Sequence, residues 1–293
     1  MTSPTSIRTA TPVERYLPGF DRLRRYERSW LRVDLLAGLT VGAMLVPQGM
    51  AYAELADMPP VTGFYAALLA LVAYAFVGSS RHLGVGPEPG TAILAATGVG
   101  AIAAGDPERY VALMAALALI VGAICLLAAV ARLGFIANVL SKPVLVGYIT
   151  GVGLTLLSSQ YAKFTGIPIT SDDFFTRTGD LLTGLDEVDG LTVAVGAATL
   201  ILIQVLRWRA PAIPGALLGV VLATVVAAAF SLDADGLVLV GEVPQGLPSF
   251  GVPSVGRNDI VELLPVAAGI ALVGYSDNVL TGRAIGTRLG YRI

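Results

Sequence analysis

Long apolar runs separated by short polar segments form the main pattern of this sequence. A helix rises about 1.5 Å per residue, so it needs about 20 apolar residues to cross the roughly 30 Å hydrocarbon core of a membrane. The pattern predicts an all-α polytopic membrane protein, with eight membrane-spanning helices. They lie at residues 33–56, 62–78, 87–104, 110–131, 143–162, 191–209, 212–230 and 260–282.

The composition excludes several other classes of protein. Hydrophobic residues make up 55% of the chain and charged residues 14%, and the mean hydropathy is +0.76. A soluble domain carries about a quarter charged residues. The 19 basic and 21 acidic residues produce no basic field that would attract nucleic acid. His82 is the only histidine and Cys125 the only cysteine. The sequence therefore offers few ligands for a common metal centre and little basis for Ser-His catalysis. We therefore expect no enzyme and no bound cofactor.

The distribution of positive charge predicts the orientation. Residues 1–32 place aromatic side chains such as Tyr16 and Trp30 among arginines, which is typical of a segment on the membrane surface. With a cytoplasmic N-terminus, the outer segments hold only Arg109, Lys163, Arg177 and Arg257, and the other 15 basic residues lie inside. This bias predicts a multi-pass cell-membrane protein with residues 1–32 in the cytoplasm. The acidic residues between the fifth and sixth runs are interpreted as a solvated external loop without a further role: Asp172, Asp173, Asp180, Asp186, Glu187 and Asp189.

Two of the apolar runs are irregular, and interrupted spans are typical of the binding sites of transporters. Pro47 and Gly49 interrupt the first run, beside the polar residues Gln48 and Tyr52. The third run is short and opens with a cluster of glycines and prolines at residues 84–90. Such a cluster cannot lie in lipid and has to face protein or a cavity.

The start of the third run has the features of an anion site. Proline fits the first turn of a helix, where its missing N–H would have no partner. We expect free backbone N–H groups at Glu88, Gly90 and Thr91, at the positive end of the helix dipole. An anion is the natural ligand of such an end. Simple packing of a short helix is the alternative interpretation.

Three segments together resemble the SulP anion-permease family, which includes sulfate permeases and bicarbonate transporters. The first is LAGLTVGAMLVPQGMAYAELADMPPVTGFYAALLALVAYAFVGSSRHLGVGP at residues 36–87. The others are VLSKPVLVGYITGVG at residues 139–153 and VGEVPQGLPSFGVPSV at residues 240–255. They occur in the order of the family, and the likeness runs from about residue 30 to the end of the chain.

The resemblance implies a fold of fourteen segments built from two inverted repeats of seven. The chain then holds the first repeat and helix eight, with core helices one to four at residues 33–131 and gate helices five to seven at residues 132–230. Residues 231–259 form an outer loop, and residues 260–293 form core helix eight. On this basis we expect an N-terminal fragment that lacks helices nine to fourteen and the STAS domain, and that does not transport by itself. When full length, the protein is expected to be a homodimer.

The family binds its anion between the third and tenth helices, against the first. Carried to this sequence, the resemblance implies the substrate-binding residues Gln48, Tyr52, Gly86, Pro87, Glu88, Gly90 and Thr91. Glu88 departs from the family pattern, in which many relatives have a small or apolar residue. A carboxylate at that position repels a dianion unless it is protonated or paired.

Asp277 places a carboxylate inside the last apolar run, where a charge costs about 2.5–3.5 kcal/mol. Thr281 lies four residues later, on the same helical face. Oxygen ligands suit a hard cation such as sodium, and desolvation equally favours a proton on the carboxylate. The family associates a carboxylate on helix eight with coupling, so Asp277 and Thr281 are the predicted coupling residues. A folding contact with Arg283 or Arg288 is the structural alternative.

The predicted function is secondary active transport of sulfate or bicarbonate, coupled to sodium or to protons, with the lipid bilayer and a small inorganic anion as the partners. A nucleobase–cation symporter is the related alternative. A membrane enzyme would need clustered His, Asp or Glu side chains near one face, and a structural half that pairs with a separate second half is a third possibility.

Overall fold

The computed structural model describes residues 19, 24, 26–78, 80, 83–133, 142–169, 174–211, 213–234, 236–239, 246 and 251–289. This part of the chain is helical and holds no strand. Most of the predicted interfacial segment, and most of the family segment at residues 240–255, lie outside it. The helices are α3 (Leu31–Leu55), α4 (Pro60–Val77), α5 (Pro89–Ala103), α6 (Pro107–Val130), α7 (Lys142–Ser159), α8 (Tyr161–Thr165), α9 (Phe174–Thr183), η2 (Leu185–Glu187), α10 (Gly190–Arg209), α11 (Gly215–Phe230) and α12 (Arg257–Leu289).

Each of the eight predicted spans corresponds to a helix: α3 to α7 and α10 to α12. By length and composition, α3, α4, α6, α10 and the first part of α12 can cross a membrane. The apolar helices α5 and α11 are shorter, as expected for the third run. Helices dominate because a backbone in lipid has to satisfy its own hydrogen bonds.

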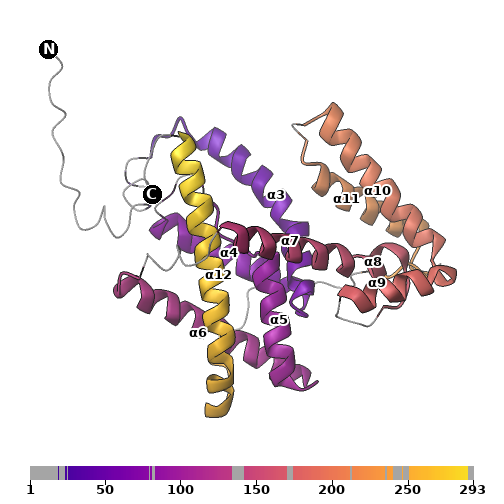
Figure 1. Ribbon diagram of the computed structural model, residues 1–293. Coiled ribbons are helices and arrows are strands. Elements are labelled where there is room, and N and C mark those ends of the chain that lie inside the picture. Colours follow the sequence, from indigo (N-terminus) through magenta and orange to yellow (C-terminus); the bar gives the residue numbers. More distant parts are fainter. Residues whose placement is uncertain are drawn as a thin grey trace.

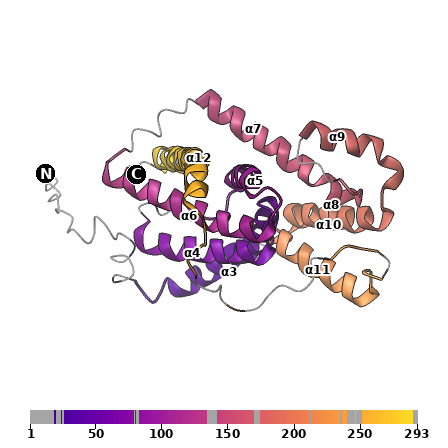
Figure 2. The same ribbon diagram turned by 90° about the horizontal axis from the view of Figure 1, so that it is seen from below.

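The helices form two groups. In Figures 1 and 2, α3 to α6 and α12 lie together, and α8 to α11 lie to one side of them, with α7 running along both. Within the first group α12 packs on α5 and α6, and α3 packs on α4; within the second, α10 packs on α11. The groups meet where α11 contacts α3 and where α7 contacts α5.

The buried centre of the first group lies between α5, α6 and α12. Val99 of α5, Leu113 of α6 and Leu263 and Ala267 of α12 are fully shielded. The Arg109 guanidinium, near the start of α6, donates to Asp259 of α12 over 2.8 Å. These contacts fix α12 beside α5 although more than 150 residues separate them in sequence, and they determine which residues surround the start of α5.

The predicted interruption of the first span is wrong. Pro47 lies inside a continuous helix α3, so the missing N–H does not end it. Gly49 is buried where α3 crosses α4 at Gly63, and a Cβ built on Gly63 would lie 2.0 Å from the Gly49 carbonyl oxygen. The glycine therefore serves close helix packing, which small residues allow in membranes.

The predicted external loop is more structured than expected. It contains the short helices α8 and α9, and Asp189 caps α10 by accepting hydrogen bonds from the Leu191 and Thr192 N–H groups. The Thr192 hydroxyl donates to the same carboxylate. The bond from this hydroxyl, together with the backbone bonds, holds the pKa of Asp189 below its usual value. Assigning Asp189 no role was therefore wrong, because a carboxylate at this position stabilises the start of α10.

Candidate functional site

The first turn of α5 is organised by the side chain of Glu88. Residues 83–88 are non-helical, and Pro89 follows as the first helical residue. The Glu88 carboxylate accepts from the Gly90 N–H at 2.8 Å and from the Thr91 N–H at 2.6 Å, and the Thr91 hydroxyl donates to the Glu88 carbonyl at 3.0 Å. The expectation of free N–H groups is therefore wrong at Gly90 and Thr91, because a carboxylate of the chain itself binds them.

Tyr148 of α7 lies against this turn. A Cβ built on Gly90 would lie 2.1 Å from the Tyr148 hydroxyl oxygen and 2.9 Å from Glu88 Oε1. Only a glycine leaves room for both groups. The Tyr148 hydroxyl is shielded from solvent and has no hydrogen-bond partner in the described part of the chain. Buried hydroxyls are nearly always paired, so an unpaired one needs an explanation.

Tyr148 was not among the site residues that the sequence predicted. The residue lies within the segment at residues 139–153 that resembles the family, and it is the one aromatic hydroxyl in that segment. Its position in this segment marks Tyr148 as a candidate but does not indicate which helix its side chain contacts. Only the packing of α7 on α5 does so.

The predicted coupling residue Asp277 lies near the same turn. Gly274 of α12 faces Thr91, since a Cβ built on Gly274 would lie 3.6 Å from Thr91 Cγ2. Asp277 follows about one turn later and is half-buried. The negative charges of Glu88 and Asp277 both act on the Tyr148 hydroxyl, and the charge of Glu88 acts on Asp277. The fold thus gathers two carboxylates and an unpaired hydroxyl at the positive end of α5.

Other predicted site residues do not join this cluster through hydrogen bonds. Gln48 Nε2 donates to the Tyr52 hydroxyl at 2.9 Å, and neither side chain bonds to the start of α5 within the described residues. Gly86 is exposed, Pro87 is half-buried and Thr281 is exposed. In the described structure no hydrogen bond joins Thr281 to Asp277. The side chain of Arg283 lies outside the described part, so the alternative ion pair stays a prediction.

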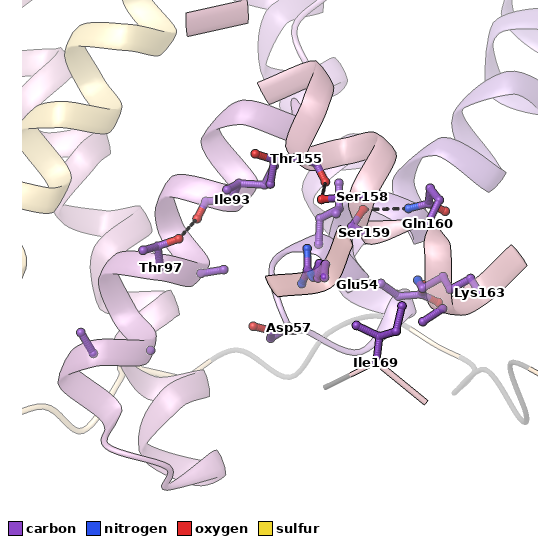
Figure 3. Close-up of a pocket in the computed structure, with 16 residues that line it drawn as sticks. Glu54, Asp57, Ile93, Thr97, Thr155, Ser158, Ser159, Gln160, Lys163 and Ile169 are labelled. Atoms are coloured by element: carbon purple, nitrogen blue, oxygen red, sulfur yellow. Dashed lines mark hydrogen bonds and ion pairs between the residues drawn. The ribbon is translucent and has the colours of Figure 1, made fainter. Parts of the chain in front are cut away.

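A polar cavity of about 460 Å³ runs along α5 beyond the cluster (Figure 3). It begins at Ile93, half a turn after Thr91, and continues to Ala101. Figure 3 shows Thr97 of α5 on one wall and Thr155, Ser158 and Ser159 of α7 on another. The cavity therefore lies between the two groups of helices.

An ion pair joins the two helix groups at this cavity. Lys163 of α8 donates to the Glu54 carboxylate at the end of α3. The distribution of positive charge predicts that both residues lie at the outer side of the membrane. Among the described residues, no group of three or more His, Cys, Asp or Glu side chains is gathered for a metal ion.

A family model, described as the sulfate permease family, matches residues 31–293. The chain belongs to the sulfate permease family. It is therefore a multi-pass membrane protein of a transporter family, as predicted. Membership of this family counts against the nucleobase–cation symporter alternative.

Curated relatives share this assignment. A probable sulfate transporter of Mycobacterium tuberculosis strain CDC 1551 is 46% identical over 278 residues, which cover 95% of this chain and 50% of the relative. A chloroplastic sulfate transporter 4.1 of Arabidopsis thaliana is 32% identical over 291 residues, which cover 96% of this chain and 42% of the relative. The chain thus spans about half the length of the curated relatives it matches.

Solved structures show the same fold. The murine solute carrier 26 family member A9, an anion transporter in the inward-facing state, superposes with a TM-score of 0.84 at 26% identity, over 100% of this chain and 52% of that one. The transmembrane domain of a cyanobacterial bicarbonate transporter, BicA, has a TM-score of 0.75 at 20% identity, over 89% of this chain and 67% of that one. The second likeness concerns the fold alone.

Proposed function

We propose that this chain forms the anion-binding first part of a secondary active transporter for a small inorganic oxyanion, sulfate or bicarbonate. One observation carries the proposal: the Gly90 and Thr91 N–H groups already bind two oxygens of a carboxylate. A sulfate or bicarbonate ion presents a similar pair of oxygens. The names of the relatives, which include sulfate transporters, support this substrate class.

The proposed anion site consists of the α5 turn and the side chains around it. Gly86, Pro87, Glu88, Gly90 and Thr91 form the turn, and the predicted residues Gln48 and Tyr52 belong to α3, which packs on α5. To these predicted residues we add Tyr148, whose unpaired hydroxyl is placed to donate to a bound oxygen. Its bond would link α7 of the gate to α5 of the core.

The grouping of helices supports a moving core and gate. The predicted core helices, α3 to α6 and α12, pack on one another, and α8 to α11 lie beside them. A core that shifts against the gate would expose the α5 turn to one side of the membrane and then to the other. We propose an inverted second repeat, a cytoplasmic N-terminus and a homodimer as parts of the complete transporter.

The anion site is tested by the substitution Tyr148→Phe. A hydrogen bond to a charged group contributes about 1.5–3 kcal/mol, so sulfate affinity is expected to fall at least about tenfold. Binding of radiolabelled sulfate to the purified protein measures this change. Tyr65→Phe is the matched control, because it removes a hydroxyl of α4 that donates to the Gly246 carbonyl instead. Equal affinities in both variants would remove Tyr148 from the site.

We also propose that Asp277, with Thr281, binds the coupled sodium ion or proton. Asp277 is half-buried on α12, about one turn after Gly274, which faces Thr91. A bound cation or proton would neutralise its charge within the membrane. The coupling ion would then change the charge of the site that receives the anion.

The variant Asp277→Asn is expected to lose the dependence of uptake on the coupling ion, with a fall of about tenfold in uptake under an ion gradient. Sulfate uptake by the complete transporter in proteoliposomes, with sodium varied at fixed pH and then pH varied without sodium, measures it. Glu262→Gln is the control, since it removes an exposed carboxylate near the other end of α12. Uptake by Asp277→Asn that still responds fully to both gradients would refute the assignment.

A further inference from the structure

Three of the helices in the described part of the chain begin with a carboxylate that accepts two backbone N–H groups. Asp106 caps α6 and Asp189 caps α10, and both side chains reach the second and third helical residues. Glu88 caps α5 in the same way. Aspartate is among the preferred residues for this position, and glutamate is not. The exception occurs at the helix that carries the proposed anion site.

The surroundings of Glu88 also differ from those of an ordinary cap. The unpaired Tyr148 hydroxyl of α7 approaches the same point beside Gly90, and Gly274 of α12 faces Thr91 of the same turn. An unpaired donor thus lies beside the two N–H groups that Glu88 occupies.

We propose that the Glu88 carboxylate is a tethered anion that competes with the transported oxyanion for the Gly90 and Thr91 N–H groups. The inference rests on the proposed function of the α5 turn. When an oxyanion binds, the Glu88 side chain turns away from the two donors. The displaced carboxylate leaves both N–H groups, and the unpaired Tyr148 hydroxyl beside them, to the oxyanion.

The competition has a measurable consequence for affinity. Removing the negative charge of Glu88 removes the competitor, so sulfate affinity rises. A carboxylate that only caps α5 produces no such change, because the anion would not have to displace it.

The experiment measures equilibrium binding of radiolabelled sulfate to the purified protein. In Glu88→Gln the competing charge is absent. We expect sulfate to bind this variant about tenfold more tightly than the wild type, which corresponds to one hydrogen bond to a charged group. Asp106→Asn is the matched control: it neutralises an equivalent cap on α6 and is expected to keep the affinity of the wild type.

A second variant keeps the test decisive if Glu88→Gln fails to fold. Glu88→Asp retains the charge and introduces a preferred capping residue, so the donors are held more tightly and sulfate binds more weakly than to the wild type. Tighter binding to Glu88→Asp would overturn the proposal. So would a Glu88→Gln variant that keeps the affinity of the wild type, because Glu88 would then be a cap alone. If neither the wild type nor any variant binds sulfate or bicarbonate at any pH, the proposed function itself fails.

Discussion

Replacing Gly63 by alanine is expected to prevent the first two spans from packing. The added Cβ would lie 2.0 Å from the Gly49 carbonyl oxygen and 2.5 Å from its carbonyl carbon. These atoms belong to the backbone of α3, so no side-chain rotation can relieve the contact, and α3 and α4 have to separate. Forced overpacking costs about 1–3 kcal/mol and more where the backbone has to shift, so we expect the upper end of that range. The yield of monodisperse protein and its thermal midpoint measure the effect.

Two glycines of α3, Gly49 and Gly42, provide controls for this prediction. At Gly49 a Cβ would be 3.4 Å from the Gly63 carbonyl oxygen, which is close to ordinary contact. At Gly42 it would meet no described atom within 4 Å. Gly49→Ala is therefore expected to cost much less than Gly63→Ala, and Gly42→Ala to be tolerated. Similar losses in all three variants would show that helix flexibility, and not the crossing of α3 and α4, explains the effect.

Gly90→Ala is expected to disable the anion site in a protein that still folds. Its Cβ would lie 2.1 Å from the Tyr148 hydroxyl oxygen and 2.9 Å from Glu88 Oε1. Both atoms are at the ends of side chains, which can move aside, so the helix survives while the added methyl group displaces the Tyr148 hydroxyl and fills the space that a bound oxygen would need. We expect sulfate affinity to fall at least about tenfold, which corresponds to the loss of one hydrogen bond to a charged group.

Gly100→Ala is the matched control for Gly90→Ala. It lies on the same helix, and a Cβ there meets no described atom within 4 Å. Alanine favours a helix over glycine by about 1 kcal/mol, so this variant should be at least as stable as the wild type and should bind sulfate normally. If Gly90→Ala binds sulfate as Gly100→Ala does, the turn at Gly90 is not part of the anion site.

Features that depend on neighbours in sequence were predictable. The eight apolar runs indicated eight helices, and the prolines before Gly90 indicated a short third helix with a non-helical approach, as α5 shows. The apparent break at Pro47 was misleading, because a helix can continue past a proline when neighbouring helices support it. The role of Asp189 was missed because a local cap was interpreted as a solvated loop residue.

The chemistry at the start of α5 was only partly visible. The sequence shows that Glu88 departs from the family pattern, but it does not indicate that this residue caps α5. The cap is nevertheless local, because the side chain only has to fold back on the first turn of the helix. Tyr148 and Asp277 come from helices far away in the sequence. No local pattern states which residues such helices bring into contact.

The sequence by itself determined that this is an all-α membrane protein and where its helices lie, and it predicted the turn that we propose as the anion site. Hydropathy and backbone hydrogen bonding act over a few residues, so the chain carries that information directly. Only the tertiary structure decided that Glu88 already occupies the donors of that turn, that Tyr148 stands unpaired beside it and that Asp277 lies near both. Those relations depend on how α7 and α12 pack on α5, which is set by side-chain contacts between distant segments.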